Sequence, residues 1–273
     1  YKNGQLTGEL KKWYANGQLQ FTATYAKDSI VGETTQYFDT GAIQRSEDRS
    51  SDQGFVREFR KDGSKVMEGV YRAEKRVGSW TYFAPDGSVL LENDLGENGD
   101  GTFTSFDAEG RKAESGSMVK GLRSGKWSVF GPTGKLIQEI TYRRDRKSGP
   151  VVAFNETGQV LTQGTLSNGK RDGRWREFFP NGQLRFDARF VSDLPVGNAT
   201  EYDESGRVLR KVKFPNRPLQ RGQIALYRDS FGVRHGTYVG YHPDGTKASE
   251  QRWELGKLVD EKRWDESGAR VER

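Results

Sequence analysis

Apolar, aromatic and glycine positions recur along this chain with a period of about 24 residues. Each repeat opens on a glycine, has an aromatic residue five positions later and has a second glycine nine positions later. Short segments between regularly spaced glycines are typical of β-hairpin repeats. The opening glycines are Gly8, Gly32, Gly54, Gly78, Gly101, Gly125, Gly149, Gly173, Gly197 and Gly236. The aromatic residues are Trp13, Tyr37, Phe59, Phe83, Phe106, Phe130, Phe154, Phe178, Tyr202 and Tyr241.

The second glycine of each repeat marks a turn. It often follows Asn or Asp, as in Asn16-Gly17 and Asp62-Gly63, and such pairs tolerate positive φ. We therefore expect a two-residue hairpin loop at each of these glycines. One strand of each repeat precedes the turn and a second strand follows it.

The side on which each strand is buried stays open. The second residue after the opening glycine is mostly apolar, as at Trp80 and Val151, and the fifth is aromatic. Positions two and five have opposite parity, so a regular strand would place them on opposite faces. Either a bulge intervenes or both faces carry aromatic rows.

Consecutive hairpins predict an all-β fold, an elongated, twisted antiparallel sheet of about a dozen β-hairpin repeats with a 24-residue period. We expect a single array over 1–273, with an irregular insertion at 215–235 that holds an extra strand at 222–227. A polar C-terminal cap is expected at 256–273, and the segment 46–53 is expected to fray. The chain begins inside a repeat motif, so we expect upstream residues to be missing.

Composition agrees with a distributed core, because only 33% of residues are hydrophobic while 12% are aromatic. No apolar run is long enough for a transmembrane helix, and no signal peptide is visible. Cysteine is absent, which excludes disulfides and thiolate sites. This favours a periplasmic or other extracytoplasmic location, with a cytoplasmic one left open.

Catalysis is not expected. The chain has only two histidines, His235 and His242, and neither has the spacing of a metal site or a catalytic triad. The stretch 94–100 has acidic residues like those of a calcium loop but carries glycine at the third position. We therefore expect no catalytic residue, no cofactor and no metal.

Basic residues gather in the connections between repeats. With 44 Lys and Arg against 38 Asp and Glu, the net charge is only +6, so an acidic protein surface is a better partner than nucleic acid. We expect these connections to share one edge of the sheet, which either binds an acidic partner or anionic lipid, or simply keeps the edge soluble. The candidates for partner binding are Lys120, Arg123, Arg143, Arg144, Arg146, Lys147, Lys170 and Arg171, with Arg72, Lys75 and Arg76 in an equivalent connection.

A second set of candidates consists of large aromatic residues at the second position of the repeat. Tryptophan and tyrosine dominate the energetics of many interfaces, but an apolar row more often packs a sheet. We favour packing and keep partner binding as the alternative. The residues are Trp80, Trp127, Trp175 and Tyr238.

The repeat resembles the MORN (membrane occupation and recognition nexus) repeat in its bacterial, longer-period form. The resemblance rests on stretches such as 8–17, Gly-Glu-Leu-Lys-Lys-Trp-Tyr-Ala-Asn-Gly, and covers nearly the whole chain. It implies no catalytic residues. Bacterial proteins of this kind are often antitoxin or immunity proteins, whereas eukaryotic relatives are associated with phospholipid binding and scaffolding. We therefore expect an immunity protein that neutralises a toxin by direct binding, with a lipid-binding envelope scaffold as the alternative.

Overall fold

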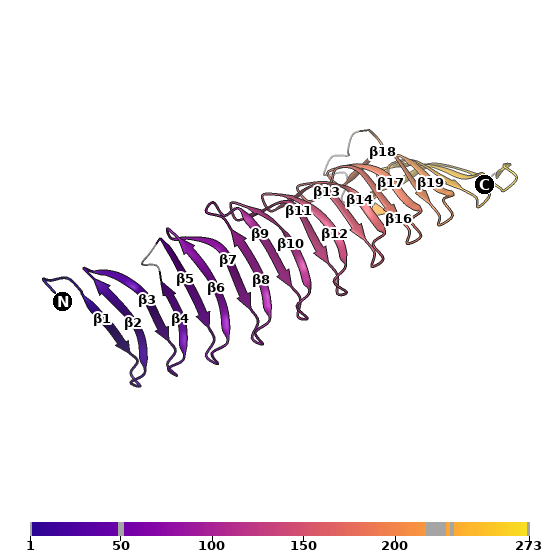
Figure 1. Cartoon of the computed structure of the whole chain (residues 1–273). Helices are drawn as coiled ribbons and strands as arrows, with labels where there is room; N and C mark the ends of the chain where they lie inside the picture. Colours follow the sequence, from indigo (N-terminus) through magenta and orange to yellow (C-terminus); the bar gives the residue numbers. More distant parts are fainter. Residues whose placement is uncertain (1, 49–51, 217–227, 230–231, 272–273) are drawn as a thin grey trace. The chain divides into compact units, whose positions relative to one another are not determined.

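The computed structural model describes residues 2–48, 52–216, 228–229 and 232–271, and within these ranges it contains strands and turns but no helix (Figure 1). The strands form an open antiparallel sheet of 23 strands, with a separate two-stranded sheet of β20 and β21. The predicted fold of hairpin repeats is confirmed. The extra strand expected at 222–227 and part of the segment 46–53 lie outside the described residues.

The chain divides into two compact units, residues 1–134 and 135–273. In the first unit each strand pairs with the next one along the chain. Its strands are β1 (Gly8–Trp13), β2 (Leu19–Ala26), β3 (Ser29–Tyr37), β4 (Ile43–Asp48), β5 (Gln53–Phe59), β6 (Lys65–Arg72), β7 (Lys75–Phe83), β8 (Val89–Leu95), β9 (Gly101–Phe106), β10 (Lys112–Val119) and β11 (Leu122–Phe130).

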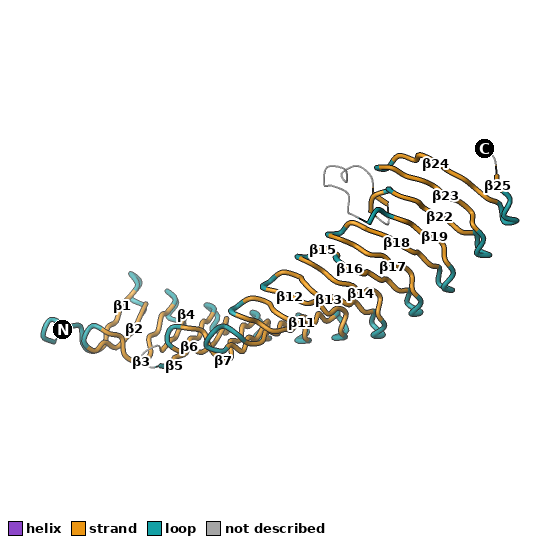
Figure 2. Tube along the Cα trace, turned by 90° about the horizontal axis from the view of Figure 1, so that it is seen from above, coloured by secondary structure: helices purple, strands orange, loops and turns teal. Residues whose placement is uncertain are grey.

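The second unit has the same order of pairing, with β19 joined to β22 across the irregular insertion. Its strands are β12 (Leu136–Arg143), β13 (Arg146–Phe154), β14 (Val160–Ser167), β15 (Lys170–Arg171), β16 (Gly173–Phe178), β17 (Leu184–Val191), β18 (Leu194–Tyr202), β19 (Val208–Lys213), β20 (Arg228–Asp229), β21 (Gly232–Val233), β22 (Gly236–Tyr241), β23 (Lys247–Glu254), β24 (Lys257–Trp264) and β25 (Arg270–Val271). Figure 2 shows the strands and loops of each unit from above.

The turn inside each repeat is longer than the sequence predicts. In the first repeat the Tyr14 N–H donates to the Gln18 carbonyl at 2.8 Å, and the Gly17 N–H donates back to the Tyr14 carbonyl at 3.0 Å. Gly17 alone has positive φ, at 82°. This is a three-residue loop, a type I turn followed by a left-handed glycine. The predicted two-residue loops are wrong, because only the glycine of the Asn-Gly pair adopts the left-handed conformation.

The tight two-residue turns lie in the links between repeats. Ala26 pairs with Ser29 across Lys27 and Asp28, whose φ angles of 51° and 66° are both positive. Two central residues with positive φ form a type I′ turn, whose twist matches that of the flanking strands. The same turn recurs at 73–74, 120–121, 144–145, 168–169, 192–193 and 255–256.

A bulge at each end of the first strand bends the repeat. The first bulge lies where β6 pairs with β7: the register shifts around Gly69, and Gly78 on β7 has positive φ. The second bulge lies where β7 pairs with β8, between Tyr82 and Phe83, just before the turn. Position two is buried, as at Trp80 with 0% exposure, while the aromatic at position five, such as Phe83, is half-buried. Of the two alternatives left open, the bulge is the one observed.

The core of each unit is a row of complementary side chains. Where position two is tryptophan, the facing residue of the preceding strand, eleven positions earlier, is glycine. A Cβ added to Gly116 would lie 2.3 Å from the Trp127 ring, and one added to Gly69 would lie 2.2 Å from Trp80. The Trp80 indole N–H completes the contact by donating to the Val70 carbonyl at 3.0 Å. The glycine therefore supplies the space in which the indole is buried.

Candidate binding surfaces

The aromatic row belongs to the core. Trp80 and Trp127 are fully buried, Tyr238 is 5% exposed and Trp175 is half-buried. Trp175 lies against Gly164, where an added Cβ would be 2.2 Å from the ring. All four side chains are thus buried or half-buried.

Arginines from the links cover several of these rings. The Arg76 guanidinium lies 4.3 Å from the Trp80 ring centroid, and that of Arg123 lies 4.4 Å from the Trp127 centroid. Arg171 lies 3.9 Å from the Phe190 centroid. Stacked guanidinium groups shield the ring from water and gain cation–π attraction. Three of the predicted partner-binding residues or their equivalents thus contribute to packing.

The link cations of the first unit also have acidic neighbours. Arg72 pairs with Glu97 at 2.8 Å, and Arg123 pairs with Glu114 at 2.6 Å. The backbone N–H of Lys120 donates to the Asp100 carboxylate at 2.8 Å, so the acidic stretch 94–100 holds the neighbouring link. The charges of Arg72 and Arg123 are therefore balanced locally.

The links of the second unit differ. A backbone hydrogen bond of 2.7 Å from the Gly169 N–H to the Lys147 carbonyl joins one link to the next. Five cationic side chains of these two links are exposed and, within the described ranges, have no hydrogen-bond, ion-pair or ring partner. Arg171, in contrast, pairs with Asp193 at 3.2 Å. We name the free set the cationic edge; its members are Arg143, Arg144, Arg146, Lys147 and Lys170.

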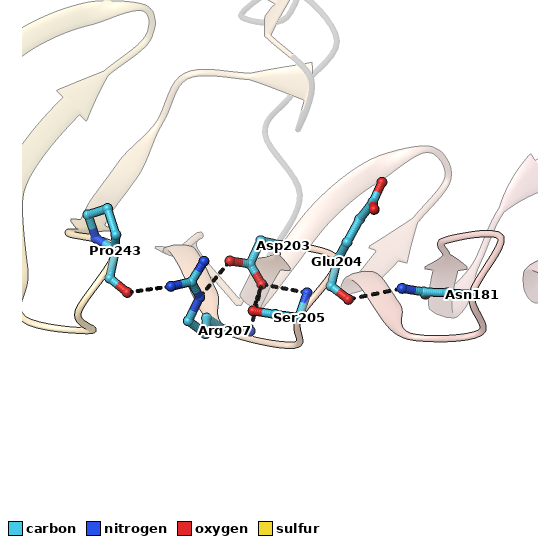
Figure 3. A network of polar contacts seen from close by, with 6 residues as sticks. All are labelled: Asn181, Asp203, Glu204, Ser205, Arg207 and Pro243. Atoms are coloured by element: carbon cyan, nitrogen blue, oxygen red, sulfur yellow. Dashed lines mark hydrogen bonds and ion pairs between the residues drawn. The ribbon is translucent and has the colours of Figure 1, made fainter.

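At the opposite ends of the hairpins, polar side chains form hydrogen bonds with the neighbouring repeat (Figure 3). The Asn181 side-chain amide donates to the Glu204 carbonyl at 3.0 Å, and Arg207 donates to the Pro243 carbonyl at 2.9 Å. Within its own turn Asp203 accepts from the Ser205 hydroxyl, the Arg207 N–H and the Arg207 guanidinium. The Ser205 bond first, and then those from Arg207, lower the pKa of Asp203 to about 2. These polar groups stabilise turns.

A third group of charges lies on the polar face of the second unit and was missed from the sequence. Arg174 and Arg176 on β16 face Arg189 and Asp187 on β17. The signal was available, because these residues have the opposite parity to the buried position two. The link cations lie close together in the sequence itself. These arginines, in contrast, come together only when β16 pairs with β17.

The part of the chain that the structure describes contains no cluster of metal-binding side chains. Groups of three or more His, Asp or Glu side chains able to hold a metal ion do not occur there. The same residues include no helix that could span a membrane. The hollows that line β13 to β18 are open to solvent.

Comparisons with solved structures give only remote similarity. A crystal structure of TarM is 17% identical, with a TM-score of 0.27, over 37% of this chain and 20% of that one. A mutant of S. aureus TarM in complex with fondaparinux is 13% identical, with a TM-score of 0.25, over 48% and 21%. The TcdB2-TccC3-Cdc42 structure is 9% identical, with a TM-score of 0.20, over 96% and 17%. The chain spans about a fifth of the length of these proteins.

No curated protein matches the sequence. The family comparison, however, agrees with the repeat. Three stretches, residues 6–27, 123–144 and 171–191, each cover one hairpin: β1 and β2, β11 and β12, and β16 and β17. All three match the model of the MORN repeat variant, and MORN repeats are generally binding modules.

Proposed function

We propose that this chain is a non-enzymatic binding protein that recognises a protein with an acidic surface through the cationic edge of its second unit. In this proposal the partner is a bacterial toxin or secreted effector, which the chain neutralises by covering it. The observation that carries the proposal is the set of five exposed cations without internal partners, Arg143, Arg144, Arg146, Lys147 and Lys170.

Comparison of equivalent links supports a role in recognition. The fold does not require cations at the turn of a link, because Ser192 and Asp193 form the equivalent turn. Solubility alone is also served by paired charges of both signs. Unpaired arginines at an exposed edge increase the rate of encounter with an acidic partner and give bidentate pairs with its carboxylates.

The test is co-purification with the product of the adjacent gene, followed by measurement of affinity and of rescue from its toxicity. We expect the triple variant R143Q/R144Q/R146Q to bind at least about tenfold more weakly, which corresponds to about 1.4 kcal/mol. The wild-type affinity should fall as salt is raised, because exposed charge pairs are screened.

The matched control is R72Q/K75Q, which removes two cations from an equivalent link of the first unit. It should retain the wild-type affinity. Absence of a complex with any neighbouring product, or equal affinities of the two variants, would contradict the proposal. Retained circular dichroism and melting temperature would show that both variants fold.

Anionic phospholipid is the alternative ligand of the same edge. Basic residues near a membrane surface each contribute about 1 kcal/mol of attraction to anionic lipid, and the five free cations lie on adjacent links. Co-sedimentation with vesicles containing phosphatidylserine, compared with neutral vesicles, tests this alternative. Binding at low salt that the triple variant loses would favour it over the protein partner.

A further inference from the structure

We propose that the polar face of the second unit carries a separate binding site, in which Arg174, Arg176 and Arg189 pair with the carboxylates of an extended acidic peptide segment. The site lies on the face of the sheet formed by β13, β14, β16, β17 and β18, and not at the link turns. It is therefore independent of the cationic edge.

The register of the strands brings these arginines together. Arg174 lies directly opposite Arg189, and Arg176 lies opposite both Asp187 on β17 and Gln163 on β14. Side chains directly opposite one another on adjacent strands share a face and lie within reach of each other. Three arginines therefore share this face with one carboxylate, and the cluster has an excess of positive charge.

The single carboxylate does not satisfy the three guanidinium groups. Asp187 accepts a hydrogen bond from the Arg174 Nε at 2.9 Å, but its distance to the Arg176 Nε is 3.9 Å. That Arg176 Nε is inaccessible to solvent in the structure and has no hydrogen-bond partner. Arg189 is exposed, and in the described part of the chain its side chain has no partner.

This arrangement costs stability unless a ligand relieves it. A buried donor without an acceptor destabilises the fold, and like charges directly opposite on a sheet repel one another. An incoming carboxylate would pair with the exposed part of the Arg176 guanidinium, whose side chain is 32% exposed, and would separate Arg174 from Arg189 by a negative charge. The cluster has the features of a site prepared for an anion.

Two open hollows on either side of Arg174 give the shape of the ligand. One, of about 300 Å³, is lined by Pro150, Val152, Gln163 and Thr165 together with Arg174 and Arg176. The other, of about 390 Å³, is lined by Arg174, Asp187, Arg189, Asn198 and Thr200, among others. An open surface does not enclose a small molecule, but an extended peptide can place one side chain in each hollow.

The chemistry of the lining favours carboxylates over a phosphate backbone. Guanidinium groups bind planar carboxylates with two parallel hydrogen bonds. The hydroxyl and amide groups of Thr165, Gln163, Asn198 and Thr200 can donate to or accept from a peptide backbone. Asp187 in the centre of the cluster would repel a closely spaced polyanion, whereas separated carboxylates can avoid it.

The experiment uses the full chain and a fluorescein-labelled decapeptide of alternating Glu and Ser, with fluorescence anisotropy as the readout. We expect R176Q and R189Q each to weaken binding at least about fivefold, since each removes one charge-assisted pair. D187N, which removes the internal competitor, should bind more tightly than the wild type. Arg185 is exposed and already pairs with Glu177 at 2.8 Å, so R185Q is the matched control and should bind normally.

Other outcomes would overturn the proposal. They are absence of binding at low salt, equal affinities of R176Q, R189Q and R185Q, or weaker binding by D187N. Binding of a labelled oligothymidine but not of the peptide would assign the face to nucleic acid instead. If R176Q does not fold, the exposed Arg189 decides the question. The triple variant of the cationic edge should bind the peptide normally, so that failure of one site is distinguishable from failure of the other.

Discussion

At the scale of the residue, burial in this sheet depends on matched sizes of facing side chains. Gly69, Gly116 and Gly164 each face a tryptophan eleven residues later. Where the later residue is smaller, the facing residue is larger, as with Ile140 opposite Val151. A sheet without a covering helix has little other means of burying an indole completely, so each pair acts as one packing unit.

The substitution G116A tests this pairing. Its new Cβ would lie 2.3 Å from the Trp127 ring, so the ring must move, and we expect a loss of about 1–3 kcal/mol in unfolding free energy. Urea denaturation of G116A, W127V and the double variant forms a double-mutant cycle. The cost of G116A should be much smaller in the W127V background, because a valine leaves room for the added methyl group, as Val151 does for Ile140. Additive effects of the two substitutions would contradict the pairing.

The sequence shows that position two is apolar. It does not show that an arginine side chain covers the ring at this position. Arg76 and Arg123 are identified in the sequence only as basic link residues. Each arginine stacks on its tryptophan because a bulge lies between them in the chain, at Gly78 for Arg76 and Trp80 and at Gly125 for Arg123 and Trp127. A bulge changes the register by local backbone geometry, and side-chain periodicity does not show it.

At the scale of the element, two different turns alternate. The turn within the repeat is stabilised by an Asp or Asn side chain that accepts backbone N–H groups, as Asp203 and Asn155 do. The link turn instead requires two residues with positive φ. The sequence predicted the first turn by its glycine, although with the wrong length. It did not predict the second, because Lys27, Ala73 and Arg144 are not residues that favour this conformation.

The turn carboxylates predict a loss of stability in acid. The pKa of Asp203 is lowered to about 2, mainly by the Ser205 hydroxyl, below the value of about 3.9 for an unfolded chain. A lowered folded pKa adds stability that is present above the unfolded value and is lost as pH falls from about 4 to about 2. The pKa values of Asp62, Asp86, Asp107, Asp244 and Asp265 are lowered too, in the same way or by a neighbouring arginine.

D203N isolates the contribution of this carboxylate, because asparagine already serves at the equivalent Asn155. We expect its melting temperature to fall less than that of the wild type between about pH 5 and about pH 2. Circular dichroism melts at several pH values provide the measurement. Parallel pH profiles of the two proteins would show that Asp203 does not contribute.

The link turns predict a stabilising substitution. Ala73 has a φ of 46° and Asn168, in the equivalent position, has a φ of 50°. Asparagine tolerates the left-handed region better than alanine, so A73N should raise the unfolding free energy by about 0.5–1 kcal/mol, and N168A should lower it by a similar amount. Thermal melts of both variants test the pair, and shifts of the same sign would be inconsistent with strain at these turns.

At the scale of the whole molecule, each strand makes its main contacts with the strands next to it in the ladder. Stability is then a sum of contributions from individual repeats and their interfaces with neighbours. The sequence predicted this organisation through its period, since residues 24 apart repeat the same role. It did not predict the division into units 1–134 and 135–273, for which the repeat pattern has no counterpart.

Because each repeat is stabilised mainly by its neighbours, a destabilising substitution should affect only the repeat that carries it and the strands beside it. G69A should disturb Trp80, against which its Cβ would lie at 2.2 Å, and should accelerate amide exchange in β6 and β7. Exchange in β16–β18 should be unchanged, because no strand of that group contacts the altered pair. G164A, which disturbs Trp175 in the same way, is the matched control and should give the converse pattern, with faster exchange in β14 and β16. Hydrogen exchange read by mass spectrometry distinguishes these patterns, and uniform acceleration along the chain in both variants would mean that the repeats unfold as one cooperative body.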